Sequence, residues 1–293
     1  MKTKKRILIL GGSGFIGKNL IEHFRNKYNI YSPSHQRLNL LDGRSVSKYF
    51  SSHKFDVVIN CVAKGGSRRE EYEKDDLNNN LRIFFNIINN KKYYKKLIHL
   101  GSGAEYDKDK SLRKVNEKEF DKRVPQDNYG LFKYICSKYI EKEGNIVSLR
   151  IFGLFGKYED YRYRFISNAI CRNLFKLPIL LKQDVYFDYV YIEDFIKIIE
   201  YFINNEAKYK FYNIGSGKRI SILSVAKFIN EISNYRSKIM VKKSGFNKEY
   251  TCDNSRLLSE LSSNFKFSEI EDSIRDLFVW YRLNQKNINK HSL

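Results

Sequence analysis

A tyrosine and a lysine four residues apart, Tyr129 and Lys133, lie in a segment whose apolar spacing predicts a helix over residues 128–143. Residues four apart share one face of a helix, so the phenol and the ammonium are expected to lie close together. A free phenol ionises only at about pH 10, but a neighbouring ammonium stabilises its phenolate. The pair therefore predicts general acid–base catalysis.

A serine supplies a hydrogen-bond donor for the same chemistry. Residues 96–100, Lys-Leu-Ile-His-Leu, are expected to form a strand, and Ser102 and Gly103 follow it. A hydroxyl at a strand end is placed to donate to a substrate carbonyl. Pairs spaced like Tyr129 and Lys133 are frequent in a chain with 22 tyrosines. The order of motifs along the chain therefore supports a catalytic set of Ser102, Tyr129 and Lys133.

A glycine-rich turn near the start of the chain predicts a dinucleotide site. The continuous apolar run 6–10 is typical of a strand buried on both faces, and a helical apolar pattern follows the turn. Glycine allows the backbone to approach a pyrophosphate, and the helix N-terminus offers it free N–H groups. The alternative is a purely structural tight turn. The residues of this turn expected to contact the cofactor are Gly11, Gly14, Phe15, Ile16 and Gly17. Ala63 and Lys64 are expected to contact it further along the chain, as are Tyr129 and Lys133, whose ammonium can also hold the nicotinamide ribose.

The second predicted strand spans residues 28–32, and the segment that follows it, up to Arg37, bears on the choice of cofactor. NAD-binding folds of this type place an acidic residue there for the ribose 2′-hydroxyl. This chain instead has Ser34, His35 and Arg37, without a carboxylate. A hydroxyl, an imidazole and a guanidinium suit a 2′-phosphate, so NADP (NADPH) is expected rather than NAD. The alternative is a solvated loop.

The remaining pattern alternates strands and helices. Apolar runs at 55–61 and 146–151 predict further strands, and a helix is expected from about residue 75 to 90. The loop at 62–66 follows a strand end, at the sheet edge where ligands bind. We expect an α/β fold, a Rossmann doubly wound parallel sheet with a smaller C-terminal substrate lobe.

Domain boundaries follow from where the alternation loosens, beyond residue 155. The Rossmann domain is expected to span residues 1–157, with a returning segment at about 184–215. Residues 158–183 and 216–293 are assigned to the substrate lobe. The polar stretch 107–125 is expected to be a loop.

Composition excludes several classes of protein. No stretch approaches the roughly 18 apolar residues needed to span a bilayer, and the run 6–10 is too short for a signal-peptide core. The four cysteines are scattered, without a C-x-x-C motif or a histidine pair. We therefore expect reduced thiols, no metal site, no membrane partner and a cytoplasmic location.

The formal net charge of +21 raises the question of nucleic-acid binding. Lysines are spread along the whole chain, beside many Asn, Ile and Tyr residues, as a general compositional bias would spread them. No nucleic-acid partner is expected. The positive field favours an anionic substrate such as a nucleotide.

With these motifs in order, the chain resembles the extended short-chain dehydrogenases/reductases of the NAD(P)-dependent sugar-nucleotide epimerase/dehydratase type, over nearly its whole length. The glycine turn and the Ser102, Tyr129 and Lys133 set match the family's cofactor turn and catalytic residues. Asn80 falls where the family has a helix asparagine near the cofactor. Residues 191–194 and 278–281 are similar to two further family segments.

Within the family, the stretches around Ala63, Lys64 and residues 100–106 are similar to GDP-fucose synthase and related NADPH-dependent 4-ketosugar reductases. That enzyme has a histidine after its Tyr-Gly-Pro motif, where this chain has Lys157 and Tyr158, so the resemblance does not carry over an epimerisation step. Phe187 replaces a phosphate-binding arginine of many relatives. The residues expected to bind substrate are Gly103, Glu105, Arg164, Lys182 and Lys248. For Glu105, lining the sugar pocket and facing solvent are both open.

The resemblance implies an oxidoreductase that uses NADPH to reduce the C4 ketone of a nucleotide-linked 4-keto-6-deoxysugar. The sugar would be a GDP-, CDP- or dTDP-linked hexose or heptose made for a surface polysaccharide. The alternatives are a 4-epimerase with tightly bound NAD, and a noncatalytic nucleotide- or RNA-binding relative. Relatives pair two helices across a homodimer, and apolar residues give the matching helices here a similar stripe: Leu81, Phe84, Phe85, Ile88, Ile135 and Ile140.

Overall fold

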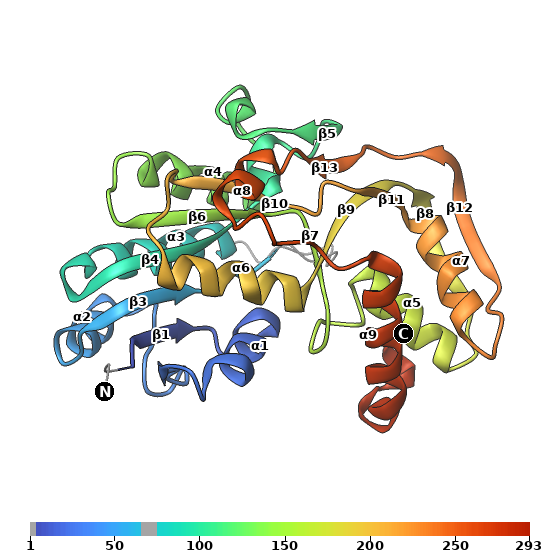
Figure 1. Ribbon diagram of the computed structural model, residues 1–293, viewed down its shortest axis with the longest axis horizontal. Coiled ribbons are helices and arrows are strands. Elements are labelled where there is room, and N and C mark those ends of the chain that lie inside the picture. The colour runs from blue at the N-terminus through green and yellow to red at the C-terminus, as the bar shows by residue number, and fades with distance from the viewer. Residues whose placement is uncertain (1–3, 66–74) are drawn as a thin grey trace. The chain divides into compact units, whose positions relative to one another are not determined.

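The computed structural model describes residues 4–65 and 75–293, so Gly66 of the expected ligand-binding loop lies outside the described residues. The chain forms two compact units. Unit 1 comprises Met1–Asp107, Phe120–Arg150 and Ile198–Tyr212, and unit 2 comprises Lys108–Glu119, Ile151–Lys197 and Asn213–Leu293. The helices and strands of both units are labelled in Figure 1.

Unit 1 is built around a sheet with the strand order β10-β6-β4-β3-β1-β2. Its strands are β1 (Arg6–Leu10), β2 (Asn29–Tyr31), β3 (Phe55–Asn60), β4 (Tyr94–Ser102), β6 (Ile146–Ile151) and β10 (Phe211–Ile214). Its helices are α1 (Phe15–Phe24), α2 (Gly43–Ser51), α3 (Asp76–Ile88), η1 (Lys91–Tyr93), η2 (Gly103–Tyr106) and α4 (Asn128–Ile140), with the end of α6 (Ile192–Asn204).

The strand order places the first glycine turn at a topological switch point. Strand β1 pairs in parallel with β2 on one side and with β3 on the other, and β3 pairs in parallel with β4. The chain therefore leaves β1 in a crevice between diverging connections, which is where parallel sheets bind ligands. The predicted α/β fold with a parallel central sheet is confirmed.

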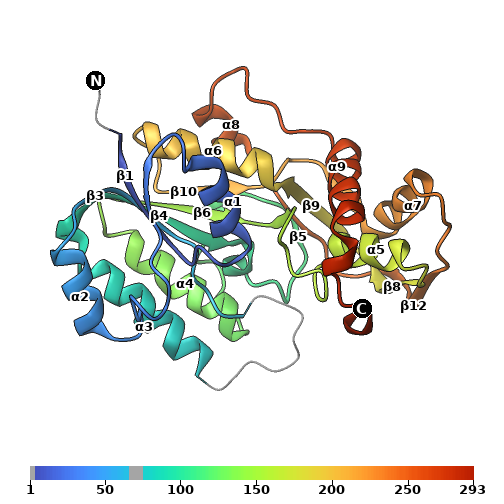
Figure 2. The same ribbon diagram turned by 90° about the horizontal axis from the view of Figure 1, so that it is seen from below.

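Helices cover both faces of this sheet (Figure 2). Helices α2, α3 and α4 bury Phe50, Phe84 and Phe132 in one core with strand residues such as Leu97. Helix α1 lies on the opposite face with the end of α6, and Lys27 donates to Glu200 there at 3.0 Å. The strands read as apolar runs because both of their faces are covered.

The stripe expected to form a dimer interface is partly used within unit 1. Phe84, Ile88 and Ile140 are at most 1 % exposed, in the core just described. Leu81, Phe85 and Ile135 are half-buried. The homodimer stays a prediction.

Unit 2 contains a second sheet of strand order β11-β9-β13-β5, with β7 paired to β9, and a separate β12-β8 ladder. Its strands are β5 (Leu112–Val115), β7 (Gly153–Phe155), β8 (Ile179–Asp184), β9 (Tyr186–Tyr191), β11 (Arg219–Ser221), β12 (Ile239–Phe246) and β13 (Tyr250–Cys252). Its helices are η3 (Glu117–Glu119), α5 (Phe165–Leu174), α7 (Ile222–Ile232), α8 (Ser255–Glu260), α9 (Ile270–Leu283), η4 (Gln285–Asn287) and η5 (Lys290–Ser292), with the start of α6.

Several local expectations differ from the structure. The stretch 107–125 was expected to be a loop, but β5 forms within it because its backbone pairs with β13, more than a hundred residues later. The expected returning segment, 184–215, is divided, because β9 pairs with unit 2 strands. Only Ile198–Tyr212 groups with unit 1.

No helix formed by residues 4–65 and 75–293 is long and apolar enough to cross a bilayer. The four cysteines all lie in these described residues and none is in a disulfide.

A buried carboxyl group lies in the core of unit 2. Glu159 is 6 % exposed, and the Ser167 hydroxyl donates to its carboxyl at 2.6 Å. Burial raises the pKa of Glu159 from 4.5 to about 7, although the Ser167 hydrogen bond and the charge of Arg164 act in the opposite direction. The folded state therefore holds this group as a neutral acid at mildly acidic pH.

We expect Glu159→Gln to remove a pH-dependent part of the stability of unit 2. Because folding raises this pKa, its contribution is fully present below pH 4.5 and is lost as pH rises through about 7. Between pH 4 and pH 8 the unmodified protein should lose about 3 kcal/mol of unfolding free energy that the variant keeps. Urea unfolding followed by the fluorescence of Trp280, the single tryptophan, measures this in unit 2.

The matched control is Glu271→Gln, which neutralises an exposed glutamate of the same unit. It should unfold with the pH dependence of the unmodified protein. Parallel pH curves for Glu159→Gln and the unmodified protein would contradict the assignment.

Candidate active site

The glycine turn after β1 is shaped by close backbone contacts. Gly11 has a φ of +79°, a conformation that side chains disfavour. A Cβ atom on Gly17 would lie 2.3 Å from the Gly11 carbonyl oxygen. Gly14 is the N-cap of α1, whose first residues are Phe15 and Ile16. The N-terminal N–H groups of α1 therefore begin directly at the switch point, the arrangement that binds a phosphate.

Asn80 of α3 fixes the loop after β3. Its amide nitrogen donates to the Lys64 carbonyl oxygen at 2.8 Å, and its amide oxygen accepts from the Lys64 N–H at 2.9 Å. Asn80 is 3 % exposed, so these two bonds satisfy a buried amide. The Asn60 side chain adds a bond from the Val62 N–H. Ala63 and Lys64 are thus held at the carboxyl end of the strand beside β1.

The residues expected to select the cofactor follow β2. Ser34, His35 and Arg37 are all exposed, and the Arg37 N–H donates to the Ser34 carbonyl oxygen in a turn. A Cβ atom on Gly12 would lie 2.0 Å from the Ser32 hydroxyl oxygen, so the end of β2 touches the glycine turn. The structure therefore brings this segment next to the turn, with its polar groups open to a ligand.

Lys133 ties helix α4 to the end of strand β4. It is 3 % exposed, and its ammonium donates to the Leu100 carbonyl oxygen at 2.5 Å. The same nitrogen lies 5.8 Å from the centre of the Tyr129 ring. The phenol and the ammonium are therefore on one face of α4, as their spacing predicts. Burial lowers the pKa of His99, and the Lys133 charge adds to this effect.

Ser102 ends β4 and caps the short helix η2. Its hydroxyl oxygen accepts from the Ala104 N–H at 3.2 Å. Since a hydroxyl both accepts and donates, this bond leaves its proton for another acceptor. Helix α4 passes close by, because a Cβ on Gly130 would lie 2.8 Å from the Ala104 carbonyl oxygen. Tyr129 therefore directly precedes Gly130, which touches residues 102–106, called the Ser102 loop below.

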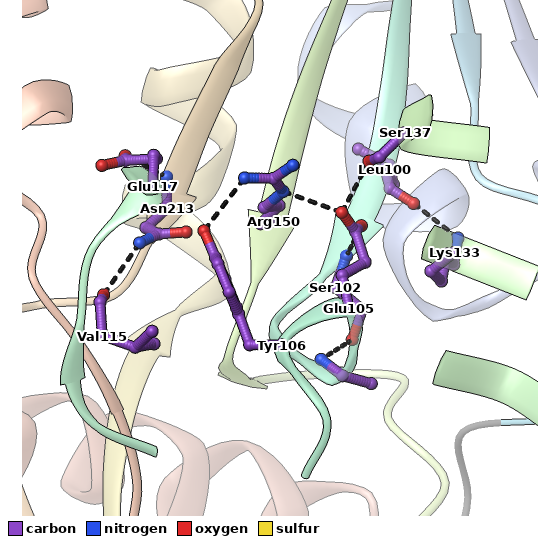
Figure 3. Close-up of polar contacts among 11 residues, drawn as sticks. Leu100, Ser102, Glu105, Tyr106, Val115, Glu117, Lys133, Ser137, Arg150 and Asn213 are labelled. Carbon is purple, nitrogen blue, oxygen red and sulfur yellow. Dashed lines mark hydrogen bonds and ion pairs between the residues drawn. The ribbon is translucent and has the colours of Figure 1, made fainter. Parts of the chain in front are cut away.

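Glu105 belongs to η2, and its side chain points toward Ser137 and Arg150 (Figure 3). It is 0 % exposed, so the alternatives of facing solvent and of lining the sugar pocket are both wrong. One carboxylate oxygen accepts from the Ser102 N–H at 2.9 Å. The other accepts from the Ser137 hydroxyl at 2.6 Å and from Arg150 Nε at 2.7 Å. Its neighbour Gly103 is likewise buried.

Arg150 of β6 carries the opposing charge in this interior. Its guanidinium lies 4.2 Å from the ring centre of Phe120 and 4.4 Å from that of Phe211, and Nη1 donates to the Tyr106 hydroxyl at 3.0 Å. Burial acts to lower the pKa of Arg150, but Glu105 and Tyr106 outweigh it and raise the pKa above its usual value. The sequence analysis missed Arg150, although one arginine in the apolar run 146–151 signals a buried partner.

Three parts of unit 1 therefore meet at the carboxyl edge of one sheet. They are the glycine turn, the loop at Ala63 and Lys64 that Asn80 holds, and the set of Ser102, Tyr129 and Lys133. Comparison with known proteins shows the family of the chain. Residues 7–215 match the model of the NAD dependent epimerase/dehydratase family. The chain belongs to this family. The resemblance inferred from the motifs is confirmed.

Full-length relatives of this family member include two synthases of GDP-linked sugars. The chain is 26 % identical to a GDP-L-colitose synthase of Yersinia pseudotuberculosis, over 96 % of this chain and 99 % of that protein. It is 22 % identical to GDP-L-fucose synthase 1 of Arabidopsis thaliana, over 96 % and 94 %. The fold matches the structure of a GDP-mannoheptose C4 reductase from Campylobacter jejuni with NADP bound, with a TM-score of 0.81, 19 % identity and coverage of 96 % and 99 %.

The family's NAD(P) cofactor fits the residues of unit 1. The glycine contacts leave backbone where side chains would block a pyrophosphate, and the start of α1 faces the same turn. Gly11, Gly14, Gly17 and the Lys64 loop would hold the dinucleotide. Among residues 4–65 and 75–293, no group of three or more His, Cys, Asp or Glu side chains is arranged to hold a metal ion.

The three cations expected to bind substrate all belong to unit 2 and are exposed. Arg164 is the N-cap of α5 and Lys182 lies on β8. Lys248 follows Asn247, whose N–H donates to the β8 carbonyl of Asp184 at 2.7 Å. Lys182 and Lys248 are thus near one ladder end, while Arg164 is on another element. Their role stays a proposal.

Arg219 is a further cation that the sequence analysis missed. It lies next to Ile220, which pairs with Phe187 of β9. Its guanidinium is 4.1 Å from the ring centre of Tyr186 and pairs with Glu249 at 3.3 Å. Only the β11–β9 register, which the sequence does not reveal, brings this guanidinium to β9.

We expect Gly17→Ala to weaken dinucleotide binding. The added Cβ would overlap the Gly11 carbonyl oxygen, so helix α1 must move away from the turn. Overpacking of this kind costs about 1–3 kcal/mol, and a tenfold weaker dissociation constant corresponds to about 1.4 kcal/mol. Titrations of NADPH and NADH by fluorescence should show a rise in Kd on the order of tenfold.

The matched control is Gly144→Ala, because a Cβ on Gly144 meets no atom within 4 Å. This variant should bind both dinucleotides normally. An unchanged Kd for Gly17→Ala would show that the turn does not contact the cofactor.

Proposed function

We propose that this protein reduces the C4 ketone of a nucleotide-linked 4-keto-6-deoxysugar with NADPH. The observation that carries the proposal is the tie between Lys133 and the end of β4, which gathers Tyr129, Lys133 and the Ser102 loop at one sheet edge. The names of the relatives support the substrate class, because they are synthases or reductases of GDP-linked sugars.

The chain's own residues would carry the proton chemistry. A bound nicotinamide cofactor supplies the hydride. As hydride reaches C4, negative charge develops on the ketone oxygen, and Tyr129 would give that oxygen a proton. The Lys133 ammonium stabilises the phenolate that remains. Ser102 would donate a hydrogen bond to the same oxygen, since its own acceptor bond to Ala104 orients the hydroxyl.

NADPH is proposed over NADH on the basis of the segment after β2. It presents Ser34, His35 and Arg37 to solvent beside the glycine turn, where a guanidinium can bind a 2′-phosphate in bidentate fashion. The NADP bound to the Campylobacter jejuni reductase supports the same choice.

The cellular setting follows from the proposed reaction. Its product would be a nucleotide-linked deoxysugar (GDP-, CDP- or dTDP-linked) for a surface polysaccharide. We further propose a cytoplasmic homodimer that pairs α3 and α4, whose residues Leu81, Phe85 and Ile135 remain partly exposed.

Tyr129→Phe should lower turnover by the ~10²–10⁴-fold typical of general acid catalysis. It removes the proton donor and little packing, so cofactor affinity should barely change. Lys133→Met should reduce both turnover and cofactor affinity, because the same ammonium would also hold the nicotinamide ribose. Ser102→Ala should cost less turnover than Tyr129→Phe, because water can partly replace its hydroxyl. Single-turnover NADPH oxidation with a panel of 4-keto nucleotide sugars, beside separate cofactor titrations, measures each effect.

Near-normal turnover by Tyr129→Phe would refute the proton assignment. If the unmodified protein oxidises no NADPH with any 4-keto sugar but interconverts C4 epimers with retained NAD, it is an epimerase.

Arg37→Glu should narrow or reverse the preference for NADPH, because a carboxylate repels the 2′-phosphate and accepts from a ribose 2′-hydroxyl. The control, Arg25→Glu, makes the same charge change at the exposed C-cap of α1, at the helix end away from the turn. It should leave the preference unchanged. The measurement is kcat/KM with each cofactor, and equal values for NADPH and NADH in the unmodified protein would refute the NADP assignment.

A further inference from the structure

Glu105 connects the segments that carry the proposed catalytic residues. Its carboxylate receives hydrogen bonds from the Ser102 backbone, from Ser137 of α4 and from Arg150 of β6. Ser137 follows Lys133 by four residues and Tyr129 by eight, so all three share one face of α4. The carboxylate therefore joins the Ser102 loop to the helix face that presents the phenol and the ammonium.

We propose that Glu105 is a positioning residue: through its bond to Ser137 it holds the Ser102 hydroxyl at a fixed position relative to Tyr129. This inference rests on the proposed function. Glu105 itself is 0 % exposed and does not reach a substrate. It acts through the loop, because one of its oxygens fixes the Ser102 N–H and the other fixes the helix.

The surroundings of the carboxylate allow little movement. A Cβ on Gly101 would lie 2.7 Å from the Glu105 carboxylate and 2.8 Å from the Ser148 hydroxyl oxygen, so strand β4 passes against this group. The Arg150 guanidinium packs against two aromatic rings and compensates the buried charge. A rigid support of this kind is what keeps a hydrogen-bond donor aligned with a reacting oxygen.

The test removes the hydrogen bond between Ser137 and Glu105, with Ser137→Ala. This variant deletes one buried hydroxyl and leaves Ser102, Tyr129 and Lys133 in the chain. Because a misplacement of about 1 Å can cost on the order of 10²-fold in rate, we expect turnover to fall roughly 10- to 100-fold. The KM for sugar and the Kd for NADPH should change less than about threefold, since the Glu105–Ser137 bond positions the Ser102 hydroxyl and not the ligands.

The decisive readout is a double-mutant cycle with Ser102→Ala. If the carboxylate works through the Ser102 hydroxyl, Ser137→Ala should have almost no further effect on turnover once that hydroxyl is gone. Additive losses would overturn the proposal, because they are what a general loss of structure produces.

The matched control is Ser148→Ala. Ser148 is 0 % exposed like Ser137, but its hydroxyl has no hydrogen-bond partner among the described residues. This deletion should leave turnover unchanged. A loss equal to that of Ser137→Ala would show that any buried cavity nearby impairs the enzyme, and would overturn the proposal.

Glu105→Gln gives a second, independent variant should Ser137→Ala fold poorly. A glutamine has one acceptor oxygen and one NH2 group, and the Ser102 N–H and the Arg150 guanidinium can only donate, so one of these two must lose its acceptor. Its turnover should fall at least as far as that of Ser137→Ala, and should likewise be insensitive to Ser102→Ala. Turnover within threefold of normal would contradict the positioning role.

Hydrogen exchange separates this proposal from the proposed function. Ser137→Ala should speed amide exchange in the peptide covering residues 100–107 by tenfold or more, and leave peptides of unit 2 unchanged. If the unmodified protein reduces no ketosugar but Ser137→Ala still speeds exchange in residues 100–107, the proposed function is wrong and the support of the loop by Glu105 stands. Unchanged amide exchange in residues 100–107 of Ser137→Ala would overturn the positioning role of Glu105, whatever the activity.

Discussion

A carboxylate withdrawn completely from water must be met by donors and by a positive charge, or it destabilises the fold by several kcal/mol. Glu105 meets this constraint with the Ser102 N–H, the Ser137 hydroxyl and Arg150. These donors come from the end of β4, from α4 and from β6, so satisfying one charge fixes three elements of unit 1. The guanidinium in turn packs against aromatic rings of two further segments, Phe120 and Phe211.

The parallel sheet provides the edge at which these elements meet. Since β1, β3 and β4 run in the same direction, their carboxyl ends deliver the glycine turn, the Asn80-supported loop and Ser102 to one side. Helix α4 joins them there because Lys133 donates to the Leu100 carbonyl. The same bonds that close the fold therefore place a phenol, an ammonium and a hydroxyl at the sheet edge that also carries the glycine turn.

Much of this could be predicted from local patterns. Glycine spacing, apolar runs and the interval between Tyr129 and Lys133 depend on neighbours a few residues apart, and the fold, the turn and the shared helix face follow from them. Strands such as β5 and β12 escaped prediction, because their residues are polar or mixed and only a distant partner makes them strands. The exposure of Arg37 and the burial of Glu105 also depend on distant segments.

The sequence by itself determined the family, the α/β class and the residues able to do the chemistry, because each is encoded in residue types at short spacing. It left Glu105 undecided, since no local pattern shows whether a carboxylate faces solvent, sugar or core. Only the tertiary structure brought Ser137 and Arg150 to it, from 32 and 45 residues away. Burial and long-range pairing are properties of the folded chain, and they made this glutamate the support of the Ser102 loop.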